Sequence, residues 1–396
     1  QHPVIGQNMY RLKDGRFEQV GISWLKHGFF AVSGNECLCG CSPTDGTVLG
    51  VGCSDPYDAF LNGRQVDLGP RFEVNAATGV FSYPFFAEGQ TGGQIYKRLQ
   101  VAISDLDPAQ DGGGQYFVEG QYVSPDDTAA GNNDNNVSYR PATIGNSGGF
   151  WFANVTGATV REQEAIRAWQ TFDPTVELTD VNIDSDGLVI VGSKSVALGN
   201  GLHAYEYAVQ NVYSDRSIGS FSIPIGPGAN VSSIGFHDVS YHSGEPYDGT
   251  DWVGTYDGQN ITWATTDYSV NPDANALRWG TLYNFRFVAD RSRSGSTATL
   301  GLFKPGTPAS VTAGVIGPQV SGIMCATAVG DGDGDCDVDL ADYSLLQDCF
   351  SGSGSGYPAS CMCFDADQDG DIDLGDLATM QAPWTGPGVP VGGCTP

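Results

Sequence analysis

The sequence predicts a mainly β protein in which two β-sandwich or jelly-roll-like domains precede a small α-helical module. The first observation is the composition, because 55 Gly, 21 Pro and 11% aromatic residues are typical of many short strands joined by tight turns. The second is the length, since 396 residues exceed what one hydrophobic core usually organises. The third is the acidic character of residues 323–396, which sets them apart from the rest.

We expect the first domain to span residues 1–172. The polar stretch 124–136 is too rich in Asn and Asp for a core element and is predicted to be a loop. Within 159–172, Val160, Ile166 and Trp169 have roughly helical spacing, so a helix is expected to close the domain. Short apolar runs between Gly, Asp, Asn and Pro predict the strands of a sandwich or barrel, namely GISWLKHGFFAV, TGVFSYPFF, KRLQVAISDL and GQYFVEGQYV.

The second domain is expected at 173–322. Its many strands with frequent turn residues predict an immunoglobulin-like or jelly-roll sandwich. The segment 307–322, low in charge and rich in small residues, is interpreted as a last strand and a linker. The predicted strands lie in DGLVIVGSKSVALG, HAYEYAVQNVY, SFSIPIG, SSIGFHDVSYH, ITWATTDYSV and TLYNFRFVAD.

The charge of the chain excludes some classes of partner. A net charge of −28 repels phosphates, which argues against nucleic acid and anionic membrane surfaces and favours cations. The sequence has no apolar run of about 18 residues, so no membrane span is expected. We expect a processed mature chain that begins at Gln1 and is located outside the cell or at its surface.

Ten cysteines form two groups, each with an even number of members. Disulfides in an oxidising, extracellular compartment are the favoured interpretation, with zinc as the alternative for the first group, and the pairing stays open. Sequons for N-linked glycans occur at Asn136, Asn154, Asn230 and Asn260, and a chain this rich in Asn, Ser and Thr contains several by chance. The cysteines are Cys37, Cys39, Cys41 and Cys53, then Cys325, Cys336, Cys349, Cys361, Cys363 and Cys394.

The tail carries two acidic loops, DGDGDCDVDLAD and DADQDGDIDLGD, and no Lys or Arg follows Lys304. Aspartates stand at loop positions 1, 3, 5, 9 and 12, and position 7 offers its backbone carbonyl. Calcium takes about six to eight hard oxygens, which alternating residues of a curled loop can supply. A disordered acidic tail would explain the charge but not the duplicated spacing. The expected ligands of two Ca²⁺ ions are Asp331, Asp333, Asp335, Asp337, Asp339 and Asp342, then Asp365, Asp367, Asp369, Asp371, Asp373 and Asp376.

A helical segment with apolar residues follows each loop, ADYSLLQDCF and then GDLATMQAPW. Val338 and Ile372, at position 8, are expected to pair the two loops through a short β-bridge. Two such loops 34 residues apart, with Asp at position 12, resemble the type I dockerin family over about residues 330–386. The resemblance implies an EF-hand-like module of two loop–helix duplicates around two Ca²⁺ ions, with a cohesin as partner.

The tail also departs from that family. Cys336 stands at position 6 of the first loop, where the family has Gly, so a disulfide is expected to brace this loop, or the loop to bind calcium more weakly. The stretch SGSGSGYPASCMC is interpreted as an insert between the repeats. The blocks before the tail resemble uncharacterised secreted proteins of planctomycete-type bacteria in SWLKHGFF, LGVGCSDPYDAFLNG, LGPRFEVNAATGVF, VEGQYVSPDDTAAGN, HSGEPYDGTDW and NALRWGTLYNFRF.

Several fragments suggest catalysis, and each has a simpler interpretation. GNSGG at 145–149 looks like a protease nucleophile loop but lacks matching His and Asp, so a glycine-rich turn is favoured. His237 and His242 are an odd number of residues apart and would face opposite sides of a strand. His27 is expected to be a strand residue at a domain surface. The nearest glycosidase candidates, interpreted as solvated residues without a partner, are Glu119, Glu206 and Glu245.

The leading hypothesis is therefore a secreted, calcium-binding, non-catalytic structural protein that assembles into a filament, surface layer or matrix. Its segment VIGQNMYRL is expected to add as a strand to the sheet edge of the next subunit, which would give an open homopolymer. The alternative is a carbohydrate-binding or adhesive protein, anchored through a dockerin–cohesin contact. Its candidate exposed platforms are Trp252, Trp263 and Trp279, although core packing is the favoured interpretation of these three residues. A polysaccharide-degrading enzyme is the third, and it requires two close carboxylates in a cleft.

Overall fold

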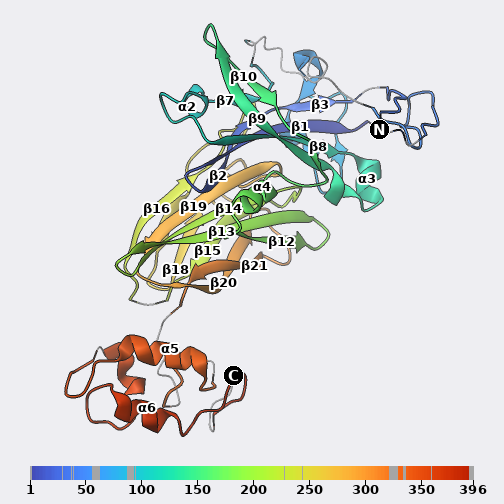
Figure 1. The fold of residues 1–396 in the computed structure, drawn as a ribbon. Coiled ribbons are helices and arrows are strands. Elements are labelled where there is room, and N and C mark those ends of the chain that lie inside the picture. The colour runs from blue at the N-terminus through green and yellow to red at the C-terminus, as the bar shows by residue number, and fades with distance from the viewer. Residues whose placement is uncertain are drawn as a thin grey trace.

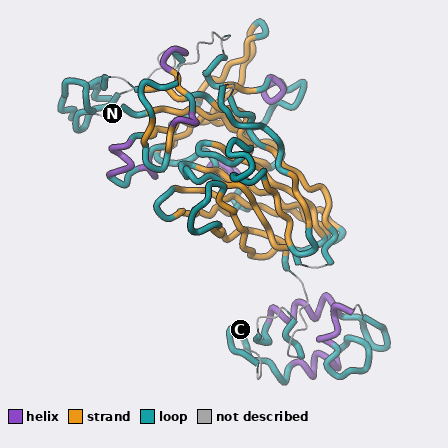
Figure 2. Tube along the Cα trace, turned by 180° about the vertical axis from the view of Figure 1, so that it is seen from behind, coloured by secondary structure: helices purple, strands orange, loops and turns teal. Residues whose placement is uncertain are grey.

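The protein is mainly β, and most of its strands lie in one continuous body (Figures 1 and 2). No helix in the described part of the chain is long and apolar enough to cross a membrane. The computed structural model describes residues 2–28, 30–36, 38, 40–55, 63–86, 93, 95–226, 228–242, 244–320, 329–332, 336–357 and 359–391.

The first block forms one nine-stranded sheet, with the order β10-β9-β8-β1-β2-β7 along its main path. β3 and β11 pair with β1 and β9 outside this path, and β4 pairs with β3. A separate two-stranded sheet contains β5 (Val74–Asn75) and β6 (Val80–Phe81). The nine strands are β1 (Val4–Lys13), β2 (Arg16–Ile22), β3 (Leu25–His27), β4 (Leu68–Gly69), β7 (Gln100–Val101), β8 (Gln115–Val123), β9 (Val137–Ser147), β10 (Phe150–Val155) and β11 (Val160–Arg161).

Strand β1 contains the segment that we expected to reach a neighbouring subunit, and it lies inside its own sheet. Its register pairs Val4 with Val123 of β8 on one side and Leu12 with Phe17 of β2 on the other. Both edges of the strand are therefore occupied within the chain, and Val4 and Tyr10 are fully buried. Donation of this strand would break the centre of the sheet, so this part of the assembly hypothesis is wrong for the fold described here.

The helix predicted at 159–172 is shorter than expected. Val160 and Arg161 form strand β11, Glu162 has a positive φ of 60°, and only Arg167–Phe172 form helix α4. The loop predicted at 124–136 contains two short helical turns. The short helices of this block are η1 (Gln65–Asp67), η2 (Arg71–Glu73), α2 (Ile103–Leu106), α3 (Pro125–Ala129), η3 (Asn133–Asn135) and α4 (Arg167–Phe172).

The second block is a β-sandwich of two five-stranded antiparallel sheets. One hydrophobic core joins them, with Tyr207 and Phe285 from one sheet and Phe221 and Trp263 from the other. The first sheet contains β12 (Glu177–Ile183), β13 (Gly187–Gly199), β14 (Leu202–Asn211), β19 (Thr281–Ala289) and β16 (Val231–His237). The second contains β17 (Val253–Tyr256), β18 (Asn260–Ala264), β15 (Ile218–Pro224), β20 (Arg293–Leu302) and β21 (Ser310–Pro318).

A second core joins the nine-stranded sheet to the sandwich. Tyr10 and Phe117 of the nine-stranded sheet share this core with Leu188 and Ile190 of β13, and Trp169 of α4 is fully buried in it. Residues alternate between the two faces of a strand. The first sandwich sheet is therefore covered on both faces, and the two blocks form three stacked layers of sheet (Figure 1).

The hairpin of β9 and β10 is an arm that projects beyond its neighbour β8. Pairing of β8 with β9 ends at Tyr116 and Ala142, whereas β9 continues to Ser147 and returns as β10. The predicted glycine-rich turn lies at its tip, where Gly148 and Gly149 have positive φ values of 61° and 88°. Figure 1 shows this green arm at the top of the molecule.

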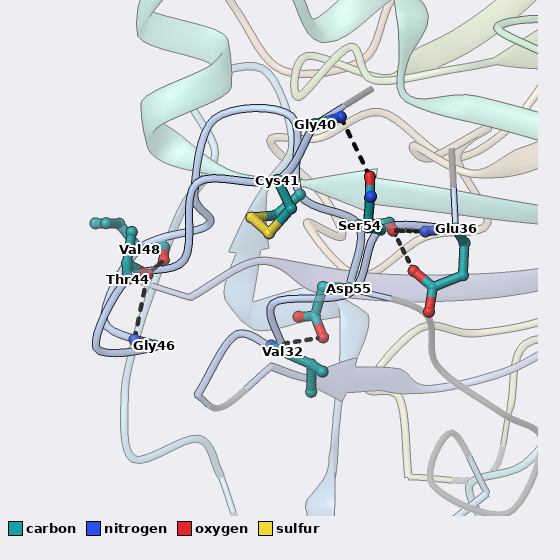
Figure 3. Close-up of a disulfide and its surroundings, with 11 residues drawn as sticks. Val32, Glu36, Gly40, Cys41, Thr44, Gly46, Val48, Ser54 and Asp55 are labelled. Carbon is teal, nitrogen blue, oxygen red and sulfur yellow. Dashed lines mark hydrogen bonds between the residues drawn. A yellow bond between two sulfur atoms is a disulfide. The ribbon is translucent and has the colours of Figure 1, made fainter. Parts of the chain in front are cut away.

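The disulfide interpretation is confirmed for Cys41 and Cys53, which are 4.2 Å apart between Cα atoms and close a surface loop (Figure 3). Polar contacts fix the same loop, because the Glu36 N–H donates to Ser54 Oγ at 3.0 Å and the Val32 N–H to Asp55 Oδ1 at 3.0 Å. Cys37, Cys39, Cys325 and Cys394 lie outside the described residues.

The described residues after 328 form a small unit with a hydrophobic core of its own. Val338, Leu346, Ile372 and Met380 are buried in this core. Its helices are α5 (Leu340–Cys349), η4 (Ala359–Phe364) and α6 (Leu374–Met380), and a disulfide joins Cys349 at the end of α5 to Cys361 in η4.

Candidate metal centre

Two aspartates begin each of the helices α5 and α6 in the same way. The side chain of Asp339 accepts from the Ala341 N–H at 2.7 Å, and Asp342 accepts from the Asp339 N–H at 2.7 Å, which together form a capping box. Asp373 and Asp376 form the equivalent box on α6. A carboxylate at a helix start satisfies amides that have no partner within the helix and interacts favourably with the helix dipole.

The aspartate at loop position 12 also ties the helix to the start of its loop. Asp342 Oδ1 accepts from the Gly332 N–H at 2.7 Å, and Asp376 Oδ1 accepts from the Ala366 N–H at 2.7 Å. Both aspartates have no exposed surface. Gly332 and Ala366 are themselves 34 residues apart, so the repeat predicted from the sequence recurs in the hydrogen bonding.

Carboxylates gather around these two position-12 residues. Three groups each bring one oxygen per residue within 4.8 Å of the others, and Asp376 belongs to two of them. The groups are Asp337, Asp339 and Asp342, then Asp365, Asp367 and Asp376, then Asp371, Asp373 and Asp376. Loop positions 1, 3, 7, 9 and 12 therefore converge in the second loop, and positions 7, 9 and 12 in the first.

The remaining predicted ligands are placed differently. Asp333 and Asp335 lie outside the described residues. Asp331 is fully buried, whereas Asp369 is exposed and belongs to none of the three groups found among the described residues. Position 7 was expected to offer only a backbone carbonyl, but the side chains of Asp337 and Asp371 are buried and belong to the groups.

The residues present fit a hard divalent cation. Asp371 is 4% exposed, and its Oδ1 is buried without a hydrogen-bond partner in the described structure. The pKa of Asp367 is raised by desolvation and then by the nearby charges of Asp376 and Asp369. Carboxylates packed without basic residues repel one another, and a cation with oxygen ligands removes that repulsion. The oxygen-only donor set favours Ca²⁺ or Mg²⁺ over metals that prefer sulfur or imidazole.

The expected β-bridge between the two loops is wrong. The Val338 carbonyl accepts from the N–H groups of Thr385 and Gly386 at 3.1 and 3.2 Å, and the Ile372 carbonyl accepts from those of Ser351 and Gly352 at 2.9 and 3.0 Å. Each position-8 residue thus pairs with a segment that follows a helix. We call residues 351–354 the first strap and residues 385–388 the second strap.

Loop position 6 needs a left-handed backbone in both loops. Gly370 has a φ of 91°, and Cys336 adopts a φ of 75° at the equivalent position. A side chain costs energy in this region, which is why Gly is usual there. Cys336 is disulfide-bonded, so a covalent bond holds the residue at this strained position. The expectation that a disulfide braces the first loop is therefore confirmed.

No protein-family model matches this chain, and no curated protein is similar to it in sequence.

The glutamates considered for glycosidase chemistry are not solvated residues without partners. Glu119 is 3% exposed and accepts from Asn8 Nδ2 at 2.9 Å, Tyr10 Oη at 2.9 Å and the Ala165 N–H at 2.7 Å. Glu206 of β14 forms a two-pronged ion pair with Arg16 of β2, at 2.9 and 2.6 Å, across the two blocks. Glu206 therefore links two layers, and Glu119 does so through Gln210 of β14, whose Nε2 donates to Glu119 Oε2 at 3.3 Å.

Glu245 links the blocks in another way. Its two oxygens accept from the N–H groups of Arg71 and Phe72, at 2.7 and 3.1 Å, at the start of η2. It lines a cavity of about 40 Å³, together with Arg71 and Arg278, which is large enough for a few water molecules. Burial raises the pKa of Glu245 to about 7.

The tryptophan candidates and two of the three histidine candidates are buried. His27 is buried rather than at a surface, and its ring centroid lies 4.4 Å from that of Phe85. His237 lies on β16, whereas His242 is buried in the loop after it, so the two do not share a strand. The core interpretation is confirmed for the three tryptophans, which are at most 6% exposed, namely Trp252, Trp263 and Trp279.

Proposed function

We propose that this chain is a secreted, non-catalytic structural protein whose residues 323–396 form a calcium-binding, dockerin-like module. Each loop would hold one Ca²⁺ ion, the first mainly through Asp337, Asp339 and Asp342. The second would use Asp365, Asp367, Asp371, Asp373 and Asp376. The bound ion would supply charge neutralisation, and the aspartates would supply its oxygen ligands. The disulfides support an oxidising compartment outside the cell.

The observation that carries this proposal is the convergence of buried aspartates in a segment without a single basic residue. Buried carboxylates are stable when paired with a cation or a dense set of donors. Backbone amides orient the carboxylates of Asp342 and Asp376, whereas Asp371 Oδ1 is buried without a hydrogen-bond partner in the described structure. A calcium ion in the second loop would bind this oxygen.

We expect Asp376→Asn to weaken calcium binding by the second loop at least about tenfold, because it removes a charge from both groups around that residue. Hydrogen exchange of residues 365–380, followed by mass spectrometry across a calcium titration, measures this. The matched control is Asp348→Asn, which removes an exposed aspartate of α5 outside both loops. Equal calcium dependence in the two variants would contradict the assignment of Asp376.

Support for self-assembly comes from the β9–β10 arm rather than from β1. Phe150, Phe152 and Val155 of β10 are 69%, 44% and 51% exposed, and β10 carries no Lys, Arg or Pro. Within the described residues the outer edge of β10 has no strand partner. Natural proteins usually protect such apolar edges, because an open edge adds strands from other chains. We propose that the arm adds to a different open sheet edge of a second copy of this chain, because only such a head-to-tail contact would give a polymer.

We expect Phe152→Lys to prevent assembly, because a charge on the edge strand opposes strand addition. Negative-stain microscopy with calcium and with EGTA compares the variant with the wild type. Val270→Lys is the control, since it places the same charge on a loop residue that is 74% exposed. Dispersed monomers of the wild type under both conditions would overturn the assembly proposal and leave the calcium proposal standing.

A further inference from the structure

The two straps of the C-terminal unit make the same contacts, although their sequences differ. In the first strap, Ser351 Oγ accepts from the Ile372 N–H at 2.9 Å, and the Gly354 N–H donates to Asp371 Oδ2. In the second strap, Thr385 Oγ1 accepts from the Val338 N–H at 3.1 Å. There the Gly388 N–H donates to an oxygen of Asp337. Residues 351–354, which belong to the stretch interpreted from the sequence as an insert, are therefore part of the repeat.

The pairing of straps with loops is crossed. The first strap follows α5, the helix of the first loop, but it contacts the second loop. The second strap follows α6, the helix of the second loop, but it contacts the first loop. Ser351 and Thr385 are 34 residues apart, as are Gly354 and Gly388, so the crossing obeys the same two-fold repeat as the loops.

The straps touch the groups that would bind the cation. Asp371 uses Oδ2 for the first strap, while its Oδ1 is buried without a partner. The strap amide thus fixes the rotation of the carboxylate and leaves the other oxygen for a ligand. Both the N–H and the carbonyl of the adjacent Ile372 are bound by the same strap, which fixes the backbone between positions 7 and 9.

Building on the proposed function, we infer that each strap positions the calcium loop of the other repeat, with Thr385 and Gly388 completing the first loop and Ser351 and Gly354 the second. Ordering of one loop–helix–strap unit then favours ordering of the other. The two calcium sites are coupled through these contacts, and residues 385–388 control a site that begins more than 50 residues earlier.

The test uses the full chain in two backgrounds, each with one loop disabled. Asp376→Asn leaves the first loop to be measured, and Asp342→Asn leaves the second, with Ca²⁺ titrated by calorimetry. We expect Thr385→Ala to weaken the first loop about fivefold or more, the cost of one lost hydrogen bond, and to affect the second loop much less. Ser351→Ala is expected to show the opposite pattern.

Two further variants distinguish the positioning of a loop by its strap from a general loss of stability of the C-terminal unit. Thr385→Ser keeps the hydroxyl and imitates the first strap, so it should restore wild-type affinity in the first loop. Ser355→Ala, an exposed residue beyond the first strap, should affect neither loop. Thr385→Ala weakening both loops equally, or weakening only the second, would overturn the crossed arrangement. Absence of calcium binding in the wild-type chain would instead refute the proposed function.

Discussion

At the residue scale, the sequence does not distinguish a carboxylate that has partners within the fold from a solvated one. Glu119 and Glu245 stand in polar or alternating stretches, and their partners are distant in the sequence. Glu119 binds residues near 8–10 and 165, and Glu245 binds the amides of Arg71 and Phe72. The grouping of the loop aspartates could be predicted because each group lies within a single loop.

Glu245 should make stability depend on pH. Its pKa is about 7 in the folded protein and near 4.5 when unfolded, so the folded state binds more protons between these values. Its contribution to stability is complete below about pH 4.5 and is lost as the pH rises to about 7, by roughly 3 kcal/mol at most. Glu245→Gln should remove this slope. Denaturant unfolding of both proteins from pH 4.5 to 8 measures the difference.

His27 is an internal check on that measurement. Burial lowers its pKa to about 4, so it makes stability rise with pH between about 4 and 6.5 in both proteins. Subtracting the two unfolding curves cancels this opposite slope. An unfolding free energy that changes with pH identically in wild type and Glu245→Gln would show that Glu245 is ionised throughout.

At the element scale, the sequence predicted strands with strong apolar alternation but not strands made of small polar residues. β13, β14 and β19 match predicted runs, because their inward residues are large and apolar. β20 (Arg293–Leu302) is rich in Ser, Thr and Gly, and its sequence resembles a loop. It is a strand because β15 pairs with one of its edges and β21 with the other. Contacts with distant parts of the chain, rather than local propensity, therefore decide its conformation.

Helix α4 shows how packing selects part of a pattern. Helical spacing extended over 159–172, but only the turn that carries Trp169 is helical, and this side chain fills the core between the blocks. Its Nε1 donates to the Gly15 carbonyl at 3.1 Å. The helix therefore joins layers rather than ending a separate domain.

We expect Trp169→Ala to reduce the free energy of unfolding by about 3–5 kcal/mol, because it opens a cavity in the core that joins the nine-stranded sheet to the sandwich. Chemical denaturation measures the loss. Phe172→Ala, on the same helix, removes a ring that is 51% exposed and should cost clearly less. Equal losses would contradict the role given to Trp169.

At the scale of the whole molecule, the sequence predicted the mainly β class, but not that a shared core joins the first two blocks. Residues 10 and 190 meet in that core, and local periodicity carries no information on such contacts. The acidic unit was easier to predict, since its repeat is local. The crossed straps were missed because Ser-Gly and Thr-Gly fragments look like linkers until the 34-residue offset is applied to them.

We propose that the two acidic loops bind calcium and thereby give the C-terminal unit its shape. Isothermal titration calorimetry of the EGTA-treated chain with Ca²⁺ tests it most directly. We predict that the wild-type chain takes up one ion per loop. The Asp342→Asn variant should take up one ion fewer, and the double variant with Asp376→Asn should lose the second ion as well. A wild-type titration without heat beyond dilution, together with unchanged hydrogen exchange of residues 336–391, would contradict the account.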